Sequence, residues 1–343
     1  MSNDDGVRYL VYRAPARGQG IGSMMNGLAA ALVLAARHDR RPCVRWHDFG
    51  IGFRWTLPCP SPEEYYVPAG DGLQTAVIDA SGVIEMWSFG ASTSGPEASA
   101  LLQSSRRIVI MYGDGGSVDV ASATPLALPA LPLPSLASAL SPPWPVVAHL
   151  RLGDPSESAR RGIFAQDGAI ERLAEQLPEG TLVLTDSAEV HGAMCGGGSQ
   201  RHPRFACPSW GVLPHSAERS GPAAGGGRRG ADPDAKHNQT RMTLLTWADW
   251  WTIHAATSHV LHTPSAFSTS ATKFSNATAC ALHDMASLQS CAARARGAQS
   301  ALRQLMSERA ASRHEGNVLD GGGVGKNPPK LRLGSMADVR VEL

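Results

Sequence analysis

A histidine, an arginine and an aspartate stand together where an apolar stretch of the chain ends. Residues 146–150 have the composition of a buried strand, and His149, Arg151 and Asp154 lie within the segment HLRLGD. An arginine is a permanent planar cation whose fork of donors matches two phosphate oxygens. The segment therefore predicts an anion site, although an arginine and an aspartate at this spacing also form purely structural ion pairs.

Polar residues also follow the next two predicted strands. Asp186 and Ser187 come after the strand 181–184, and a carboxylate there can accept hydrogen bonds from a base or a sugar hydroxyl. The strand 259–262 is followed by hydroxyl side chains at the start of a helix, where free N–H groups and the helix dipole favour an anion. These hydroxyls belong to Ser265, Ser268 and Thr269. The simpler alternative is that these side chains only cap their helices.

The three polar segments are expected to meet. Parallel strands joined by right-handed crossovers present their carboxyl ends on one edge of the sheet, where open α/β folds bind ligands. The combination of an arginine, a carboxylate and a hydroxyl-lined helix start predicts a pocket for a nucleotide diphosphate.

A glycine turn lies near the N-terminus, between a strand at 7–12 and an apolar helix at 24–36. Gly20 and Gly22 permit a tight turn, but Ser23 stands where the dinucleotide pattern G-x-G-x-x-G needs its third glycine. This departure argues against an NAD-linked oxidoreductase, and the absence of G-K-[ST] excludes a Walker phosphate loop. A glycine turn that only lets the helix pack closely is the alternative.

The order of strands and helices predicts an α/β protein with parallel sheets. Further strands are expected at 43–46, 75–78 and 107–111, and further helices at 167–176, 247–256, 269–285 and 287–313. We expect an N-terminal Rossmann-like domain at 1–123, a proline-rich linker at 124–145, a C-terminal domain at 146–313 with a disordered insertion at about 192–236, and a flexible tail at 314–343. The tryptophans of WADWW (247–251) are expected to be core or interdomain packing.

Composition restricts the class of protein. The chain has 343 residues, of which 43% are hydrophobic and 18% charged, and its formal net charge is +1. These values are typical of a globular protein and give no overall field for nucleic acid. The sequence shows no membrane span, signal peptide or membrane anchor, and two glycosylation sequons, Asn238-Gln-Thr and Asn276-Ala-Thr, matter only in a secreted chain.

The six cysteines show no metal-ligand spacing, so no metal site is expected. Cys195 and Cys207 could pair in an oxidising compartment. If Cys280 and Cys291 lie on one helix, they are separated by about 16 Å, which is too far for a bridge.

Taken in order, the glycine turn, HLRLGD, TDS and WADWW...SHVLHTPSAFSTSA resemble the GDP-fucose-dependent fucosyltransferases of GT-B fold: the α1,6-fucosyltransferase, protein O-fucosyltransferase and plant xyloglucan fucosyltransferase group. The resemblance covers roughly residues 7–48 and 144–285. It implies two Rossmann-like domains facing across a cleft, GDP-fucose as donor, transfer with inversion to a glycan or glycoprotein acceptor, and no metal or other cofactor.

The resemblance also implies roles for single residues. Arg151 would contact the diphosphate and stabilise the leaving GDP, while His149 and Asp186 would hold the guanosine. Ser265, Ser268 and Thr269 would contact phosphates, and Gly20, Gly22 and Ser23 would lie beside the sugar nucleotide. Neither the resemblance nor the sequence identifies the general base, and Asp48 in WHDFG and Asp154 are named for it only as guesses.

The chain departs from the family in several ways. Leu152 replaces a second basic residue that many members carry, the first domain is short, and the insertion at 192–236 is long. An inactive relative that binds a nucleotide or carbohydrate is therefore the alternative function. The resemblance implies a location in the Golgi or endoplasmic reticulum lumen, and a chain outside that pathway would be cytoplasmic.

Overall fold

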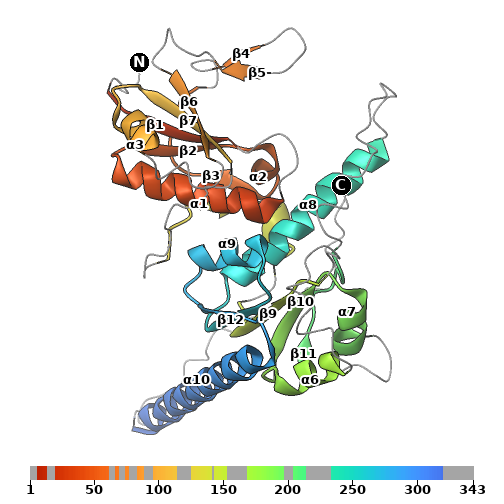
Figure 1. Cartoon of the computed structure of the whole chain (residues 1–343). Coiled ribbons are helices and arrows are strands. Elements are labelled where there is room, and N and C mark those ends of the chain that lie inside the picture. Colours follow the sequence, from red (N-terminus) through yellow and green to blue (C-terminus); the bar gives the residue numbers. More distant parts are fainter. Residues whose placement is uncertain are drawn as a thin grey trace. The chain divides into compact units, whose positions relative to one another are not determined.

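The computed structural model describes residues 6–13, 20–61, 66–68, 74–76, 83–88, 96–113, 125–140, 143–152, 168–196, 204–213 and 233–319. The chain divides after Ala298 into two compact units, Met1–Ala298 and Gln299–Leu343. The first unit contains both parallel sheets (Figure 1).

The N-terminal sheet has four parallel strands in the order β2-β1-β7-β6. Their bounds are β1 Tyr9–Arg13, β2 Arg41–Arg45, β6 Val83–Ser88 and β7 Ile108–Gly113. Helix α1, Ile21–Arg37, buries an almost continuous apolar face against this sheet, because its residues between Met24 and Ala35 are mostly small or apolar. The predicted strands 7–12, 43–46 and 107–111 and the helix 24–36 are confirmed within a few residues, while β6 was not predicted.

Shorter elements connect this sheet to the rest of the first unit. They are α2 (His47–Gly52), β3 (Phe53–Trp55), β4 (Tyr66–Pro68), β5 (Gln74–Ala76), α3 (Pro96–Gln103), β8 (Ala130–Pro132) and α4 (Pro134–Ala137). The strand expected at 75–78 is β5, which pairs antiparallel with β4. The proline-rich segment 124–145 contributes β8, paired antiparallel with β3, and Leu136 of α4 is fully buried.

The C-terminal sheet has five parallel strands in the order β11-β10-β9-β12-β13. The strands are β9 Val146–Leu150, β10 Thr181–Thr185, β11 Phe205–Ala206, β12 His259–His262 and β13 Thr278–Ala281. The helices are α6 Ala169–Gln176, α7 Ala188–Cys195, α8 Pro233–His254, α9 Ala266–Phe274 and α10 Met285–Leu319. The predicted α/β class with two parallel sheets is thereby confirmed. The described residues 204–213, inside the predicted insertion, contain β11.

The single helix predicted at 269–285 is wrong. Helix α9 ends at Phe274, and β13 follows it as an edge strand beside β12. As a result Cys280 lies on β13 and Cys291 on α10, and the two form a disulfide with a Cα–Cα distance of 5.9 Å. The predicted separation failed because it assumed that both cysteines share one helix.

One continuous cluster of buried residues joins the two sheets. It runs from Leu10 and Met111 of the first sheet through α1, α9 and α8 to Val147 and Leu184 of the second. The tryptophans of WADWW belong to this cluster, as predicted. Trp247 and Trp250 are fully buried, and the Trp247 indole N–H donates to the carbonyl oxygen of Asp48 at 2.7 Å.

Close approach of α1 and α9 requires a glycine. A Cβ atom at Gly22 would overlap the backbone of Ala266 and Phe267 at the start of α9. Asn26, one turn later on α1, accepts a hydrogen bond from Lys273 at 2.7 Å and donates to the carbonyl oxygen of Ala266 at 3.4 Å. The glycine turn therefore does permit close helix packing, and it brings the N-termini of α1 and α9 together.

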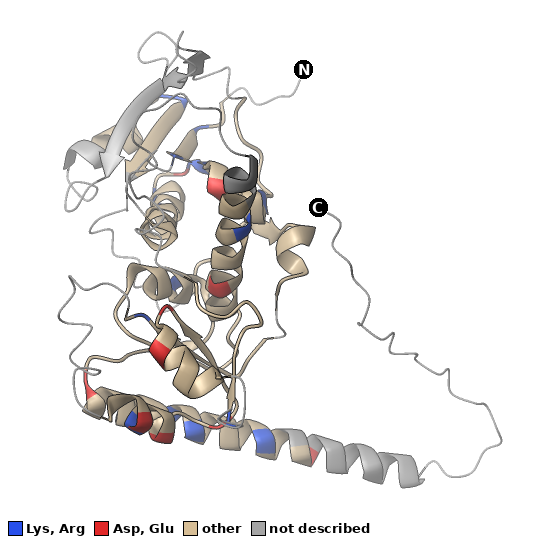
Figure 2. Ribbon diagram, turned by 90° about the vertical axis from the view of Figure 1, so that its right-hand side faces the viewer, with Lys and Arg blue, Asp and Glu red and all other residues tan. Residues whose placement is uncertain are grey.

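Helix α10 continues past the end of the first unit. Its residues 301–305 are exposed, and charged residues of both signs lie along the described part of the helix (Figure 2). Among the described residues, no helix combines the length and apolarity that crossing a membrane requires.

Candidate functional site

The three polar segments singled out in the sequence meet at the carboxyl edge of the second sheet. In the strand register, His149 of β9 lies opposite Leu184 of β10 on one side and His262 of β12 on the other. The chain moves from β9 to β10 on one side and later adds β12 on the other side. This edge is therefore a topological switch point, the place where open α/β sheets bind ligands.

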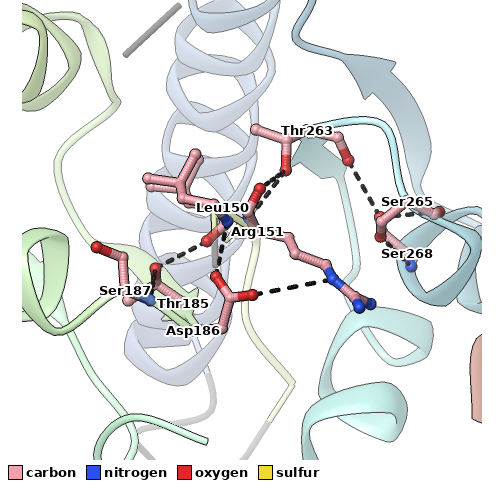
Figure 3. A network of polar contacts seen from close by, with 9 residues as sticks. Leu150, Arg151, Thr185, Asp186, Ser187, Thr263, Ser265 and Ser268 are labelled. Carbon is pink, nitrogen blue, oxygen red and sulfur yellow. Dashed lines mark hydrogen bonds and ion pairs between the residues drawn. The ribbon is translucent and has the colours of Figure 1, made fainter. Parts of the chain in front are cut away.

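The main chain at Arg151 is held by Thr263, the residue that follows β12. The Thr263 hydroxyl accepts the Arg151 N–H at 2.8 Å and donates to the Arg151 carbonyl oxygen at 3.2 Å (Figure 3). Thr263 itself is fully buried. One side chain thus occupies both polar groups of the Arg151 main chain and fixes where its side chain begins.

Asp186 holds the same segment from β10. Its Oδ1 atom accepts the Leu152 N–H at 2.7 Å, and its Oδ2 atom lies 3.9 Å from Nε of Arg151. The Arg151 and Asp186 side chains are only 17% and 11% exposed, so solvent screens their attraction less than it would on the surface. Both carboxylate oxygens therefore face the Arg151–Leu152 segment, which makes Asp186 a positioning residue for the arginine.

Two hydroxyl side chains form further hydrogen bonds at this edge. The Thr185 hydroxyl donates to the Leu150 carbonyl oxygen at 2.7 Å and accepts the Ser187 N–H at 3.1 Å. Ser187 is the N-cap of α7, where its hydroxyl accepts the Val190 N–H at 3.3 Å. Ser187 therefore acts as a helix cap, which was the alternative to a ligand contact.

The hydroxyls at the start of α9 differ in their surroundings. Ser265 caps the helix and accepts the Ser268 N–H at 3.1 Å. Ser268 is fully buried, with its hydroxyl 2.7 Å from that of Ser265 and 3.2 Å from Nδ1 of His262. Thr269 is exposed. Of the three predicted phosphate contacts, Thr269 is thus the one whose side chain reaches solvent, while Ser265 and Ser268 shape the helix start.

The two histidines of the edge are buried. The His149 ring lies 5.3 Å from the Phe267 ring, and only 7% of the residue is exposed. Burial lowers the pKa of His262 from its ordinary value, with the hydrogen bond to the Thr263 carbonyl opposing this effect. The same Nδ1 atom of His262 faces both the Thr263 carbonyl oxygen and the Ser268 hydroxyl.

The N-terminal half contributes the start of α1. Gly20 precedes this helix, Gly22 contacts Ala266 and Phe267, and Ser23 is half-buried. Because α1 and α9 meet at their N-termini, two positive helix ends lie side by side.

The two candidates for the general base are placed differently. Asp154 lies outside the described residues. Asp48 is half-buried on α2, and its carbonyl oxygen accepts the Trp247 indole N–H.

Sequence reasoning did not single out Thr263 or His262. Both lie in the quoted segment HTPSAFSTSA, but their contacts depend on which strands are neighbours. A threonine at the first position after a parallel strand was the available signal. Within the described ranges, no three side chains of the metal-ligating types His, Cys, Asp and Glu come together.

At the sequence level the chain matches no family model and no curated protein. Fucosyltransferases are among the solved structures that it resembles. One is a mutant of the Arabidopsis thaliana fucosyltransferase FUT1 in complex with GDP, which aligns over 83% of this chain and 72% of that one with 12% identity and a TM-score of 0.47.

Two further similar structures are of NodZ. The fucosyltransferase NodZ from Bradyrhizobium aligns over 77% of this chain and 92% of its own, with 15% identity and a TM-score of 0.37. NodZ α1,6-fucosyltransferase soaked with GDP-fucose aligns over 78% and 93%, with 13% identity and a TM-score of 0.38. At these values the similarity establishes neither a substrate nor an activity for this chain.

Proposed function

We propose that the protein is a metal-independent glycosyltransferase that transfers fucose from GDP-fucose, with inversion, to a glycan or glycoprotein acceptor. The observation that carries this proposal is the arrangement around Arg151. Thr263 holds the Arg151 main chain, and the weakly exposed Arg151 guanidinium lies beside the Asp186 carboxylate at the switch point of a parallel sheet. The choice of GDP-fucose among nucleotide sugars rests on the motif resemblance.

The arrangement suits the charge that develops in glycosyl transfer. As the bond between the sugar and the β-phosphate breaks, negative charge grows on the diphosphate, and donors already aimed at that charge lower the barrier. Arg151 supplies a forked cation, and it needs little reorganisation because its main chain is fixed on both sides. In this proposal the cation does the work that a metal ion does in other transferases.

The adjacent helix starts add to the same field. The N-termini of α1 and α9 are in contact, and Thr269 offers an exposed hydroxyl in the first turn of α9. Free N–H groups at helix starts and the helix dipole stabilise phosphate groups. We assign the diphosphate to this region and the guanosine to the His149 side of the edge.

The proposed division of labour follows the two sheets. The C-terminal domain, 146–313, would bind the donor, and the N-terminal domain, 1–123, would bind the acceptor. The acceptor hydroxyl must lose its proton during transfer, and Asp48 is the described candidate for the base.

Thermal unfolding with added nucleotides tests donor binding. A ligand that binds only the folded state raises the midpoint of unfolding. We expect GDP and GDP-fucose to raise it, and UDP, ADP and NADH to leave it unchanged. Stabilisation by NADH alone would instead favour an oxidoreductase.

Substitution of the arginine tests catalysis. Arg151→Lys keeps the charge but loses the fork, and loss of one such donor typically lowers kcat by about 10²- to 10³-fold. GDP-fucose turnover should fall by this amount while circular dichroism stays unchanged. Arg54→Lys, the same substitution at an exposed arginine on β3, is the matched control and should retain full turnover. Tight GDP binding without turnover in the unmodified protein would favour the inactive binding relative.

A further inference from the structure

All six cysteines of the chain form disulfides. The pairs are Cys43–Cys59, Cys195–Cys207 and Cys280–Cys291, with Cα–Cα distances of 5.4, 5.8 and 5.9 Å. These distances lie within the range of about 4.4–6.8 Å that a disulfide requires. Three bridges in separate parts of the fold, with no thiol left over, indicate a chain that matures in an oxidising compartment. The glycosylation sequons therefore become relevant, because such compartments of eukaryotic cells add N-linked glycans.

The sequon at Asn276 has the surface placement that a glycan needs. Asn276 is exposed in the turn between α9 and β13, and Thr278 is also exposed. The residue between them, Ala277, is buried, and its N–H donates to the Ser275 hydroxyl at 3.1 Å. The Thr278 N–H donates to the Ser258 carbonyl oxygen at 2.8 Å. The two residues that follow Asn276 are thus anchored, while Asn276 itself is exposed.

The turn also lies away from the candidate site. Thr278 begins β13 and is in register with His259, which begins β12 and is itself opposite Val146 at the start of β9. Asn276 therefore lies at the amino edge of the sheet, whereas Arg151 follows the carboxyl end of β9. Strands of this length separate the two edges by about 15 Å. A glycan on Asn276 would point away from the proposed donor site.

The second sequon is placed differently. Asn238 is exposed, but it lies inside the helix α8 and not in a turn. Acceptor asparagines are typical of surface loops, which favours Asn276.

We propose that Asn276 carries an N-linked oligosaccharide added in an oxidising secretory compartment. The donor would be a lipid-diphosphate-linked oligosaccharide. The Asn276 amide nitrogen forms a bond to the sugar C1 as the bond from C1 to the diphosphate oxygen breaks. The lipid diphosphate leaves, and the amide loses one proton to a base of the transferring enzyme.

Peptide mass spectrometry of the protein isolated from the cells that make it naturally is the direct test. Alkylation before reduction should label no cysteine, and the peptide with Asn276 should carry a glycan that peptide-N-glycosidase removes with conversion of the asparagine to aspartate. An unmodified Asn276, glycosylation at Asn238 alone, or free thiols in the native protein would each overturn the proposal.

Sequon variants of the full chain, expressed in the same cells, provide the controls. Asn276→Gln and Thr278→Ala should lose the glycan, whereas Thr278→Ser and Asn238→Gln should retain it. Because the acceptor sequence is recognised before folding is complete, a variant that folds poorly still reports on the site. Loss of the glycan in Thr278→Ser together with its retention in Thr278→Ala would contradict the assignment.

Discussion

The hydroxyl of Thr263 takes both polar groups of the Arg151 main chain, at 2.8 Å from the nitrogen and 3.2 Å from the carbonyl oxygen. This contact links the segments that follow the two strands of the switch point, β9 and β12. An arginine whose main chain is fixed in this way presents its guanidinium in a narrow range of positions. Such preorganisation is what electrostatic stabilisation of a leaving group requires.

Thr263→Val should therefore lower kcat by more than its loss of folding stability explains. The variant keeps the shape of the side chain but leaves the Arg151 N–H without its acceptor, at a cost of about 1–3 kcal/mol. A small displacement of a positioned group can cost up to about 10²-fold in rate, so we expect kcat for GDP-fucose turnover to fall by about 10- to 100-fold.

Two variants separate this effect from simple loss of a buried hydroxyl. Thr263→Ser keeps the hydroxyl and should retain most of the turnover. Thr252→Val removes a buried hydroxyl on α8 that donates to the Ala248 carbonyl oxygen at 2.7 Å, and it should lower stability without lowering kcat. Equal kcat values for Thr263→Val and the unmodified protein would show that this contact does not position Arg151.

Gly22→Ala tests the contact between α1 and α9. The added methyl group would overlap the backbone of Ala266 and Phe267, and backbone cannot move aside as a flexible side chain can. Overpacking of this kind typically costs about 1–3 kcal/mol. Denaturant unfolding should show this loss, and GDP should stabilise the variant less because the two helix starts are displaced.

Gly50→Ala is the matched control for that substitution. Gly50 also lies in a helix, α2, but a Cβ atom there would have no neighbour within 4 Å. Alanine is the better helix former by about 1 kcal/mol, so this variant should be as stable as the unmodified protein or more stable. Equal effects of the two substitutions would mean that helix propensity, and not close packing, explains Gly22.

Much of the architecture could be predicted because its strands are short apolar runs that end in polar segments. Residues 146–150, 181–184 and 259–262 were assigned correctly for this reason, and the rule that parallel strands share a carboxyl edge placed Arg151 and Asp186 together. Strand β13 could not be recognised, because its sequence TACA is short and half exposed and reads as a continuation of α9. The related assumption that Cys280 and Cys291 share one helix hid their disulfide.

The individual contacts of the site could not be predicted from the sequence for a different reason. Thr263 contacts Arg151, 112 residues away, only because β12 lies next to β9, and strand order is not written in any local pattern. The burial of Ser268 could not be foreseen either, since a serine after a helix cap is usually exposed. The residue types at the edge were predictable, but which atoms face one another was not.

Arg40, directly before β2, allows a test of what stabilises the amino edge of the first sheet. The residue is only 5% exposed, and its guanidinium donates to four carbonyl oxygens at 2.7–3.2 Å. These carbonyls belong to Tyr9, Leu102, Ser104 and Arg106. Burial, with a smaller effect from Arg8, lowers the pKa of Arg40 to about 10, which still leaves the group charged at neutral pH.

Arg40→Met should destabilise the protein by on the order of 3 kcal/mol, because it leaves several buried carbonyl groups without donors. Denaturant unfolding measures the loss. The stability of Arg40→Lys should fall between those of the unmodified protein and Arg40→Met, since an ammonium has fewer donors than a guanidinium. The exposed Arg54→Met should change stability by less than about 0.5 kcal/mol. If Arg40→Met were as mild as Arg54→Met, the carbonyl cluster would contribute nothing to the stability of the sheet.

Acid should destabilise the protein through its buried histidines. Burial is the largest cause that lowers the pKa of His254, His259 and His262 below the ordinary value of 6.5. The unfolded chain therefore binds protons more tightly than the folded one. The contribution of these histidines to the free energy of unfolding should be complete above about pH 6.5 and should be lost as the pH falls below that value.

Denaturant unfolding at pH 7.5 and pH 5.5 measures this dependence. The pKa of Asp284 is also lowered, chiefly by hydrogen bonds from Ser287, but its contribution is lost only as the pH falls below about 3.8 and so lies outside this window. His262→Gln removes one of the titrating groups, and the difference between the two pH values should be smaller in this variant. A free energy of unfolding that is higher at pH 5.5 than at pH 7.5 would mean that the buried histidines are protonated in the folded protein.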